Sequence, residues 1–463
     1  MRINDYSGIK YFIRKLESLA EVALLAIVYY WFWKNYYRAA GYFRYLGNGK
    51  YVLMGVYALL IYLLFFFCDS FKFGYLKAID AMTGQWIALL IVNTVTYFQL
   101  CLIANHMLNV LPLLAMTGID FVIAFVLVFI YTVIYHHFYV PKDMLMIYGN
   151  KESIILKVKM DRRSDKYHVS KILSCEEPVD LLQKEILNHD AVIINDVHAE
   201  LRNDLLKYCY ERKIRTYIVP KISDIINRGA EEISLFDTPL LLVKGYGPTR
   251  IQLVVKRFFD ILLCTVALIP CAPIMGLVAL AIKIEDHGPV FYKQTRVTKD
   301  EKTFDILKFR SMIVNAEKEG KSIPASDHDP RITKVGRIIR ATRIDELPQI
   351  LNILQGDMSI VGPRPERVEH HEAYCAEIPE FVYRTKVKGG LTGYAQIYGK
   401  YNTSAYDKLR LDLMYIENYS LLLDIKLILM TLQIVIKPEA TEGFDKIITI
   451  DDVMEQMKEE KTK

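Results

Sequence analysis

The 463-residue sequence lacks several features that would assign it to common protein classes. Its seven cysteines are odd in number and include no CxxC pair, which argues against a disulfide framework and a cysteine metal site. Lys and Arg (58) barely exceed Asp and Glu (53), and these charges are interspersed, so nucleic acid is not an expected partner. No GxGxxG segment is present, which argues against a dinucleotide site.

What the chain has in excess is apolar surface, because 52% of its residues are hydrophobic. Four nearly uncharged stretches lie before residue 140: Leu19–Trp33, Tyr51–Phe67, Gln85–Ile103 and Leu111–Tyr135. Each is close to the roughly 20 residues that a helix needs to cross a bilayer. The sequence therefore predicts four transmembrane helices in residues 1–140. The first lacks a small-residue cleavage site and is expected to stay in the mature protein.

Loop charge gives an expected orientation. Four spans put the N-terminus and everything after the fourth span on one side of the membrane. That side holds six cations, Arg2, Lys10, Arg14, Lys15, Lys72 and Lys77, and the opposite side holds four, Lys34, Arg38, Arg44 and Lys50. By the positive-inside rule, this excess favours a cytoplasmic location for the rest of the chain.

Residues 141–245 turn soluble in composition. Short β-like runs at Met144–Tyr148, Ala191–Asn195 and Arg215–Val219 alternate with helical patterns such as Ala199–Lys213, as in a small Rossmann-like α/β domain. After the first run a single glycine, Gly149, precedes charged residues, so a structural or regulatory module is preferred to a cofactor site.

A fifth apolar segment, Ile261–Ile282, is long enough to span the membrane. Pro270 and Pro273 interrupt it, and Lys256, Arg257 and Lys283 make both of its ends basic. These features favour a bent, re-entrant helix over residues 256–284, with a kinked transmembrane helix as the alternative.

Candidate phosphate-binding residues follow. Lys308 and Arg310 lie two residues apart, on one side of a predicted strand, where they could hold phosphate or form surface salt bridges. Arg337, Arg340 and Arg343 share one helix face and lead directly into Asp345-Glu346. Because proline is tolerated in a helix's first turn, Pro348 places this acidic pair at the beginning of the next helix, where a capping role is the alternative.

Two loops complete the candidate site. Pro363 and Pro365 stiffen the backbone around Arg364, whose planar guanidinium could meet a phosphate or a pyrimidine edge. The glycine-rich stretch 388–393 is either a linker or a place where backbone amides approach an anion. The apolar stretch Tyr419–Ile436 predicts a membrane-surface or core helix, and the polar tail 438–463 is expected to be partly disordered or loosely docked.

From Lys256 onward the chain resembles the catalytic domain of the bacterial sugar transferases, the monotopic polyprenyl-phosphate phosphoglycosyltransferases. The resemblance is carried, in order, by 256-KRFFD-260, 288-GPVF-291, 308-KFRSM-312, 329-DPRIT-333, 345-DELPQ-349, 362-GPRP-365 and 391-LTG-393. It departs at Ala272, His287 and Gly389, where the family often has Ser, Pro and Pro. None of the three touches the expected chemistry, although the missing serine puts a hydrogen bond at the helix bend in doubt.

The resemblance implies an architecture. It is a membrane protein with an N-terminal four-helix transmembrane bundle (1–140), a Rossmann-like α/β middle domain (141–245) and a C-terminal phosphoglycosyltransferase domain (246–437). The last is an α/β domain that carries the re-entrant helix. The large members of the family have the same order of parts.

The resemblance also implies a reaction, in which Asp345 attacks the sugar-bearing phosphate of a UDP-sugar, expels UMP and passes the phosphosugar to undecaprenyl phosphate. Glu346 would help Asp345 hold Mg²⁺ or would orient the Asp345 nucleophile. Phosphate would be contacted by Lys308, Arg310 and Arg340. The uridine-phosphate pocket would be shaped by Pro363, Arg364 and Pro365. Mg²⁺ suits carboxylate and phosphate oxygens.

The implied setting is the bacterial inner membrane, with the catalytic domain facing the cytoplasm, at the first membrane step of capsule, exopolysaccharide or O-antigen synthesis. Glucose or galactose is the expected donor sugar. Whether the chain forms a homo-oligomer is left open by the sequence. The alternatives are a membrane-anchored, NAD-dependent sugar-nucleotide epimerase or dehydratase, which the missing GxGxxG disfavours, and a catalytically silent scaffold, which would not need the acidic pair.

Overall fold

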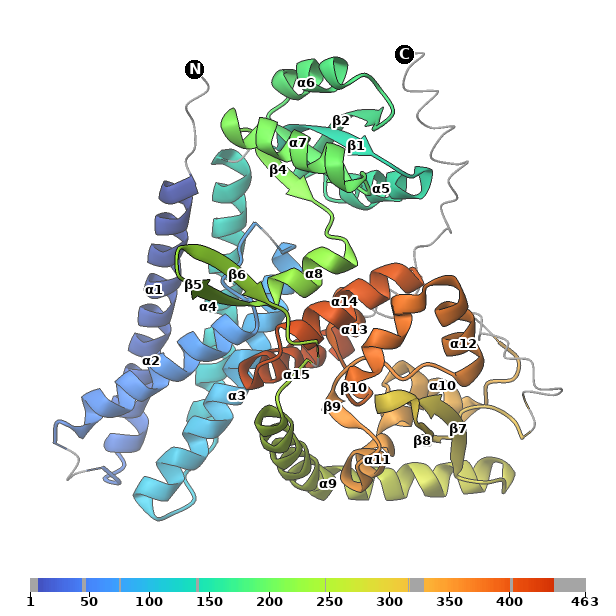
Figure 1. Cartoon of the computed structure of the whole chain (residues 1–463). Helices are drawn as coiled ribbons and strands as arrows, with labels where there is room; N and C mark the ends of the chain where they lie inside the picture. The colour runs from blue at the N-terminus through green and yellow to red at the C-terminus, as the bar shows by residue number, and fades with distance from the viewer. Residues whose placement is uncertain are drawn as a thin grey trace. The chain divides into compact units, whose positions relative to one another are not determined.

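A computed structural model of the chain describes residues 7–43, 47–74, 76–138, 141–245, 247–314, 316, 329–399 and 403–436. The predicted tail, 438–463, lies outside the described residues. The described chain forms two compact units, of which the first runs to Val219 and the second starts at Pro220. Figure 1 shows the helices and strands of both units.

Long apolar helices open the first unit. They are α1 (Ser7–Phe32), continued by the π-helix η1 (Trp33–Arg38), α2 (Gly49–Phe67), α3 (Ala78–Ala104) and α4 (Leu111–Phe138). Each predicted transmembrane stretch lies within one of these segments, all of which are long and apolar enough to cross a bilayer. α2 packs against α1 and α3, and α4 packs against α3 and α1. The chain is therefore a membrane protein.

Buried polar side chains link three of these helices. The hydroxyl of Tyr57 donates to Asn93 at 2.8 Å, and Asn93 donates to Thr117 at 2.9 Å and to Asp120 at 3.1 Å. Polar groups surrounded by apolar helices need such partners because hydrocarbon offers them none. The contacts fix α2, α3 and α4 relative to one another.

An α/β domain completes the first unit. Strands β1 (Lys142–Tyr148), β2 (Tyr167–Ser174), β3 (Ala191–Asn195) and β4 (Arg215–Ile218) form a parallel sheet in the order β2-β1-β3-β4. Helices α5 (Ile155–Asp161), α6 (Val179–Asn188) and α7 (Ala199–Glu211) connect them. The three predicted strands and the predicted helix at Ala199 are confirmed. The sequence did not reveal β2, because this edge strand is half exposed and has no apolar run.

The carboxyl ends of β1 and β3 are where a Rossmann fold would hold a dinucleotide pyrophosphate. Here a Cβ added to Gly149 would lie 2.0 Å from the carbonyl oxygen of Asp196. Asn195 also donates to the carbonyl of Ser153 at 2.8 Å. The turns that follow the two strands therefore pack directly against each other.

The second unit begins with α8 (Ile222–Arg228) and the antiparallel hairpin of β5 (Glu231–Leu235) and β6 (Thr238–Leu242). Ile222 and Ile225 of α8 are buried in one core with Leu409 and Leu413 of α14 (Ala405–Glu417). The sequence assigned residues up to 245 to the middle domain. The compact unit starts earlier, at Pro220, because α8 packs on α14.

The remaining elements of this unit follow the hairpin in the sequence. They are α9 (Arg250–Asp286), β7 (Phe291–Val297), η3 (Lys299–Glu301), β8 (Thr303–Phe309), α10 (Lys334–Ala341), η5 (Ile344–Glu346), α11 (Gln349–Gln355), β9 (Ser359–Val361), α12 (Val368–Glu377), η6 (Pro379–Lys386), β10 (Gly390–Thr392), α13 (Tyr394–Tyr398), α14 and α15 (Leu421–Ile436). β7 pairs antiparallel with β8, and β9 pairs parallel with β10.

The 37-residue helix α9 is also long and apolar enough to span a bilayer. Figure 1 shows it as two arms that meet at a bend. Pro270 and Pro273 lie inside it, and each removes a backbone donor and favours a kink. One face packs on the domain along most of the helix, through Lys256, Asp260, Cys264, Leu268, Cys271, Met275, Val278, Ala279 and Ile282. Large exposed apolar side chains include Ile251, Phe258, Leu262, Val266, Ile269, Leu277, Leu280 and Ile284.

Candidate active site

Asp345 and Glu346 lie in one tight turn between two helices. α10 ends at Ala341, Arg343 adopts a left-handed φ of 54°, and the 3-10 turn η5 then carries both carboxyl groups. Non-glycine residues adopt that φ uncommonly, which marks a sharp reversal of the chain. Pro348 directly precedes α11, where its missing N–H costs no helical hydrogen bond. The acidic pair thus lies just before α11, not inside it.

Glu346 is held between two cations from other segments. Lys308 of β8 donates to Glu346 Oε1 at 2.7 Å, and Arg364 Nη2 donates to the same oxygen at 3.1 Å. Burial by itself would raise the pKa of Glu346, but Arg364 and Lys308 outweigh burial and hold that pKa well below its usual range. Glu346 is therefore ionised at neutral pH.

Asp345 is half-buried, and its carboxylate accepts no hydrogen bond from the part of the chain that the structure describes. Burial raises the pKa of Asp345; the neighbouring Glu346 charge adds to this rise, while Lys308, Arg340 and Arg343 oppose it. A carboxylate that has cations nearby but no hydrogen-bond donor keeps its lone pairs available to an electrophile.

The other two predicted phosphate-binding residues, Arg340 and Arg310, lie in different environments. Arg340, in the last turn of α10, acts electrostatically on Asp345. Arg310 is buried elsewhere: its guanidinium pairs with Asp286 at the end of α9, and its Nε donates to the carbonyl of Pro289 at 2.6 Å. Lys308 and Arg310 do not act as a pair, because Lys308 binds Glu346 while Arg310 binds Asp286 of α9.

The loop 362–365 packs against the glycine-rich segment. Gly390 N donates to the carbonyl of Pro363, and Gly362 N donates to that of Thr392, both at 2.8 Å. A Cβ on Gly390 would lie 2.1 Å from Gly362 N, so only glycine fits there. The segment is a packed strand, β10, rather than the linker that its composition also allowed.

Two arginines that were not predicted reach the same loop. Arg296 Nη1 donates to the carbonyl of Pro365 at 3.1 Å, and Arg384 Nη2 donates to the carbonyl of Arg364 at 2.9 Å. These partners are 69 and 20 residues apart in the sequence. No local motif or periodicity connects residues at such separations, so the sequence carried no signal for either contact.

A pocket borders this loop. Its lining includes Thr298, Pro363, Arg364, Pro365, Glu366 and Arg384. Arg364 therefore lines a pocket while its guanidinium contacts Glu346.

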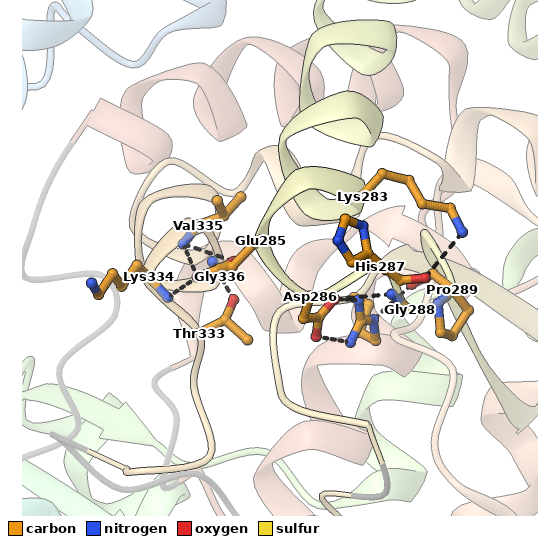
Figure 2. Close-up of polar contacts among 11 residues, drawn as sticks. Lys283, Glu285, Asp286, His287, Gly288, Pro289, Thr333, Lys334, Val335 and Gly336 are labelled. Carbon is orange, nitrogen blue, oxygen red and sulfur yellow. Dashed lines mark hydrogen bonds and ion pairs between the residues drawn. The ribbon is translucent and has the colours of Figure 1, made fainter.

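The two ends of α9 are fixed to the elements that carry the site. At its first turns Lys256 donates to Asp424 of α15 at 2.7 Å, and Ser359 of β9 donates to Asp260 at 2.7 Å. Figure 2 shows the other end, where Glu285 accepts hydrogen bonds from Lys334 N at 2.7 Å and from Val335 N at 3.3 Å. α9 thereby caps the N-terminus of α10, the helix that leads to Asp345.

The acidic pair suits the predicted magnesium ion. Among the described residues, no group of three or more His, Cys, Asp or Glu side chains could hold a metal. Mg²⁺ is commonly bound by one or two carboxylates together with substrate phosphates and water, rather than by a cage of protein ligands. Asp345 and Glu346 supply such a pair, so the residues present fit Mg²⁺ that arrives with a phosphorylated substrate.

A comparison with protein families matches the part of the chain that carries this site. The model of the family described as bacterial sugar transferase matches residues 251–438. The chain is 37% identical over 261 residues to the UDP-N-acetylgalactosamine-undecaprenyl-phosphate N-acetylgalactosaminephosphotransferase of Aeromonas hydrophila, covering 54% of this chain and 60% of that protein.

Two further relatives are both named UDP-glucose:undecaprenyl-phosphate glucose-1-phosphate transferase. The protein of Klebsiella pneumoniae is 39% identical over 248 residues, covering 52% of this chain and 51% of that protein. The protein of Caulobacter vibrioides is 41% identical over 202 residues, covering 42% of this chain and 75% of that protein. The chain matches a little over half the length of the Aeromonas and Klebsiella proteins.

Proposed function

Because the chain belongs to the bacterial sugar transferase family, we propose that it transfers a sugar 1-phosphate from a UDP-sugar to undecaprenyl phosphate and releases UMP. The observation that carries this proposal is the turn at Asp345–Glu346. There Lys308 and Arg364 neutralise Glu346, while Asp345 accepts no hydrogen bond from the described residues. Glucose or galactose is the proposed donor sugar.

In the first step, a carboxylate oxygen of Asp345 attacks the phosphorus atom that bears the sugar. The bond from this phosphorus to the bridging oxygen breaks, and UMP leaves with that oxygen and the electron pair. The product is an aspartyl phosphosugar. The charges of Lys308, Arg340 and Arg364 support this step, because an anionic phosphate would otherwise repel a carboxylate.

In the second step, a phosphate oxygen of undecaprenyl phosphate attacks the same phosphorus atom and displaces the Asp345 carboxylate. This forms undecaprenyl diphosphosugar and regenerates the enzyme. Mg²⁺, held by Asp345 and Glu346 with substrate phosphates, would neutralise charge on the transferred group. Glu346 stays ionised throughout because Arg364 and Lys308 keep its pKa low against the effect of burial.

The contacts of α9 support a re-entrant helix at 256–284. Its first turns are bonded to Asp424 and Ser359, and its last residues to Arg310 and Lys334, all of which belong to one compact unit. A helix that crossed the bilayer would carry its far end to the other side. With both ends on one domain, the exposed apolar face would enter the bilayer from the cytoplasmic side of the bacterial inner membrane.

Labelling with a membrane-impermeant maleimide tests this topology. Cysteines introduced by Asn227→Cys in α8, before α9, and by Lys293→Cys in β7, after it, lie at exposed positions. A re-entrant helix labels both in inverted vesicles and neither in intact cells, above the background of the parent chain. Labelling of the two positions from opposite sides would sink the re-entrant arrangement.

The NAD-dependent alternative is less well supported. The turns after β1 and β3 meet where a dinucleotide pyrophosphate would lie, as the 2.0 Å approach at Gly149 indicates. A silent scaffold, for its part, gives no reason for two cations to converge on Glu346.

The reaction is tested with purified protein in detergent, Mg²⁺, undecaprenyl phosphate and a panel of UDP-sugars, with UMP release as the readout. Wild type should release UMP with one donor, and Asp345→Asn should release none. Arg337→Gln, an exposed change on α10, is the matched control. Undiminished UMP release by Asp345→Asn would rule out the covalent step, and no release from any donor by folded wild type would contradict the proposed function.

A further inference from the structure

The loop that presents Arg364 is fixed through its carbonyl groups. Proline has no N–H, so Pro363 and Pro365 cannot anchor this loop as donors. Four consecutive carbonyls, of residues 363–366, instead accept hydrogen bonds from distant segments. Their donors are Gly390 N at 2.8 Å, Arg384 Nη2 at 2.9 Å, Arg296 Nη1 at 3.1 Å and Val297 N at 3.0 Å.

Arg384 is itself immobilised. It is 4% exposed, and Asp412 Oδ2 accepts from its Nε at 3.0 Å and from its Nη2 at 2.7 Å. Glu366 Oε1 lies 3.5 Å from Arg384 Nη1 and also 3.5 Å from Lys408 Nζ. Because the guanidinium is planar and rigid, pinning it to Asp412 also fixes the N–H that reaches Arg364 O.

Arg296 reaches the loop from strand β7. Its Nη1 contacts the carbonyl of Pro365, its Nη2 donates to Gln294 at 2.6 Å, and its backbone bridges to Arg367. Burial, together with the charges of Arg364 and Arg367, lowers the pKa of Arg296 to about 10, so it stays charged at neutral pH. Arg296 therefore donates to the carbonyl of Pro365 despite the repulsion of the nearby Arg364 and Arg367 charges.

On the basis of the proposed function, we propose that Arg296 and Arg384 are positioning residues, which hold the backbone of Arg364 so that its guanidinium meets Glu346 and the diphosphate of the donor. In the described structure both reach the loop's main chain, whereas Arg364 alone among the three reaches Glu346. A loop fixed before the donor binds loses less conformational freedom on binding, which is favourable for affinity.

Double-mutant cycles test this role, with kcat/KM for UMP release and UDP affinity by calorimetry as readouts. Arg384→Lys keeps the charge but cannot hold Asp412 and Arg364 O with the same fork, so kcat/KM and UDP affinity should fall about tenfold or more. In an Arg364→Ala background the same change should cost less than about twofold, since Arg384 would act through Arg364. Arg296→Lys should behave in the same way.

The matched control is Arg410→Lys on α14, a guanidinium that pairs with Asp407 at 3.1 Å. It should leave both readouts unchanged. An equal loss from Arg384→Lys with and without Arg364 would overturn the proposal, and Arg296→Lys serves if Arg384→Lys does not fold. Non-additive UDP binding in a protein that releases no UMP would support the positioning role while contradicting the proposed reaction.

Discussion

Asp345 and Glu346 are neighbours in the chain, yet their carboxylates have opposite electrostatic environments. Burial raises the pKa of Asp345, whereas Arg364 and Lys308 overcome the burial of Glu346 and lower its pKa. The difference arises because both cations donate to Glu346 and neither donates to Asp345. Two residues of the same turn are thereby suited to different tasks, one as a fixed charge and the other as a reactive group.

Glu346→Gln should keep the shape of the turn but remove the charge between Lys308 and Arg364. We expect kcat to fall by about 10²–10³, the usual effect of removing one well-placed electrostatic group. UMP release at saturating UDP-sugar measures this. Glu377→Gln, an exposed change at the end of α12, should leave kcat unaltered. Wild-type turnover by Glu346→Gln would contradict a role for that charge.

The activity should decline on the acid side of neutrality as the Asp345 carboxylate becomes protonated. Its pKa is raised above the ordinary value of 3.8, so the reactive carboxylate is lost as pH falls through this higher value. Arg340 lowers the pKa of Asp345, so Arg340→Gln should move the acid limb of kcat/KM to higher pH. Arg337→Gln, on the exposed part of the same helix, should not move it. A limb that stays in place in Arg340→Gln would show that another group controls it.

The cap that Glu285 places on α10 should contribute to both stability and activity. Glu285→Ala removes the acceptor for Lys334 N and Val335 N and should lower the free energy of unfolding by about 0.5–2 kcal/mol, as for other lost caps. Glu285→Gln keeps an acceptor oxygen and should cost less. Thermal unfolding in detergent, followed by UMP release, measures both effects. Equal stabilities of the alanine variant and wild type would show that the cap is dispensable.

Gly390→Ala should distort the loop that carries Arg364. The added Cβ would lie 2.1 Å from Gly362 N, an overlap that the backbone must relieve at a cost of about 1–3 kcal/mol. We expect a raised KM for the UDP-sugar as well as a lower melting temperature. At Gly276 in α9 a Cβ has open space, so Gly276→Ala is the control. An unchanged KM in Gly390→Ala would mean that the loop tolerates the shift.

Local patterns predicted the elements of the α/β domain where strands are fully buried, as at Ala191–Asn195, but not the half-exposed edge strand β2. They also placed the acidic pair before its helix, because Pro348 limits where α11 can begin. They left open whether Lys308 and Arg310 hold phosphate or form salt bridges. Alternation places both residues on one side of a strand, but it cannot tell that Glu346 binds the first and Asp286 the second.

The sequence by itself determined the apolar helices, the turn at Asp345–Glu346 and the stiff loop around Arg364, because hydropathy, proline and residue spacing act over a few residues. Only the tertiary structure decided which cations meet Glu346, which end of α9 caps α10, and which arginines hold the loop's carbonyls. Those contacts join residues far apart in the chain. Their geometry depends on how β7, β8, α9 and α14 pack, and no local pattern encodes that packing.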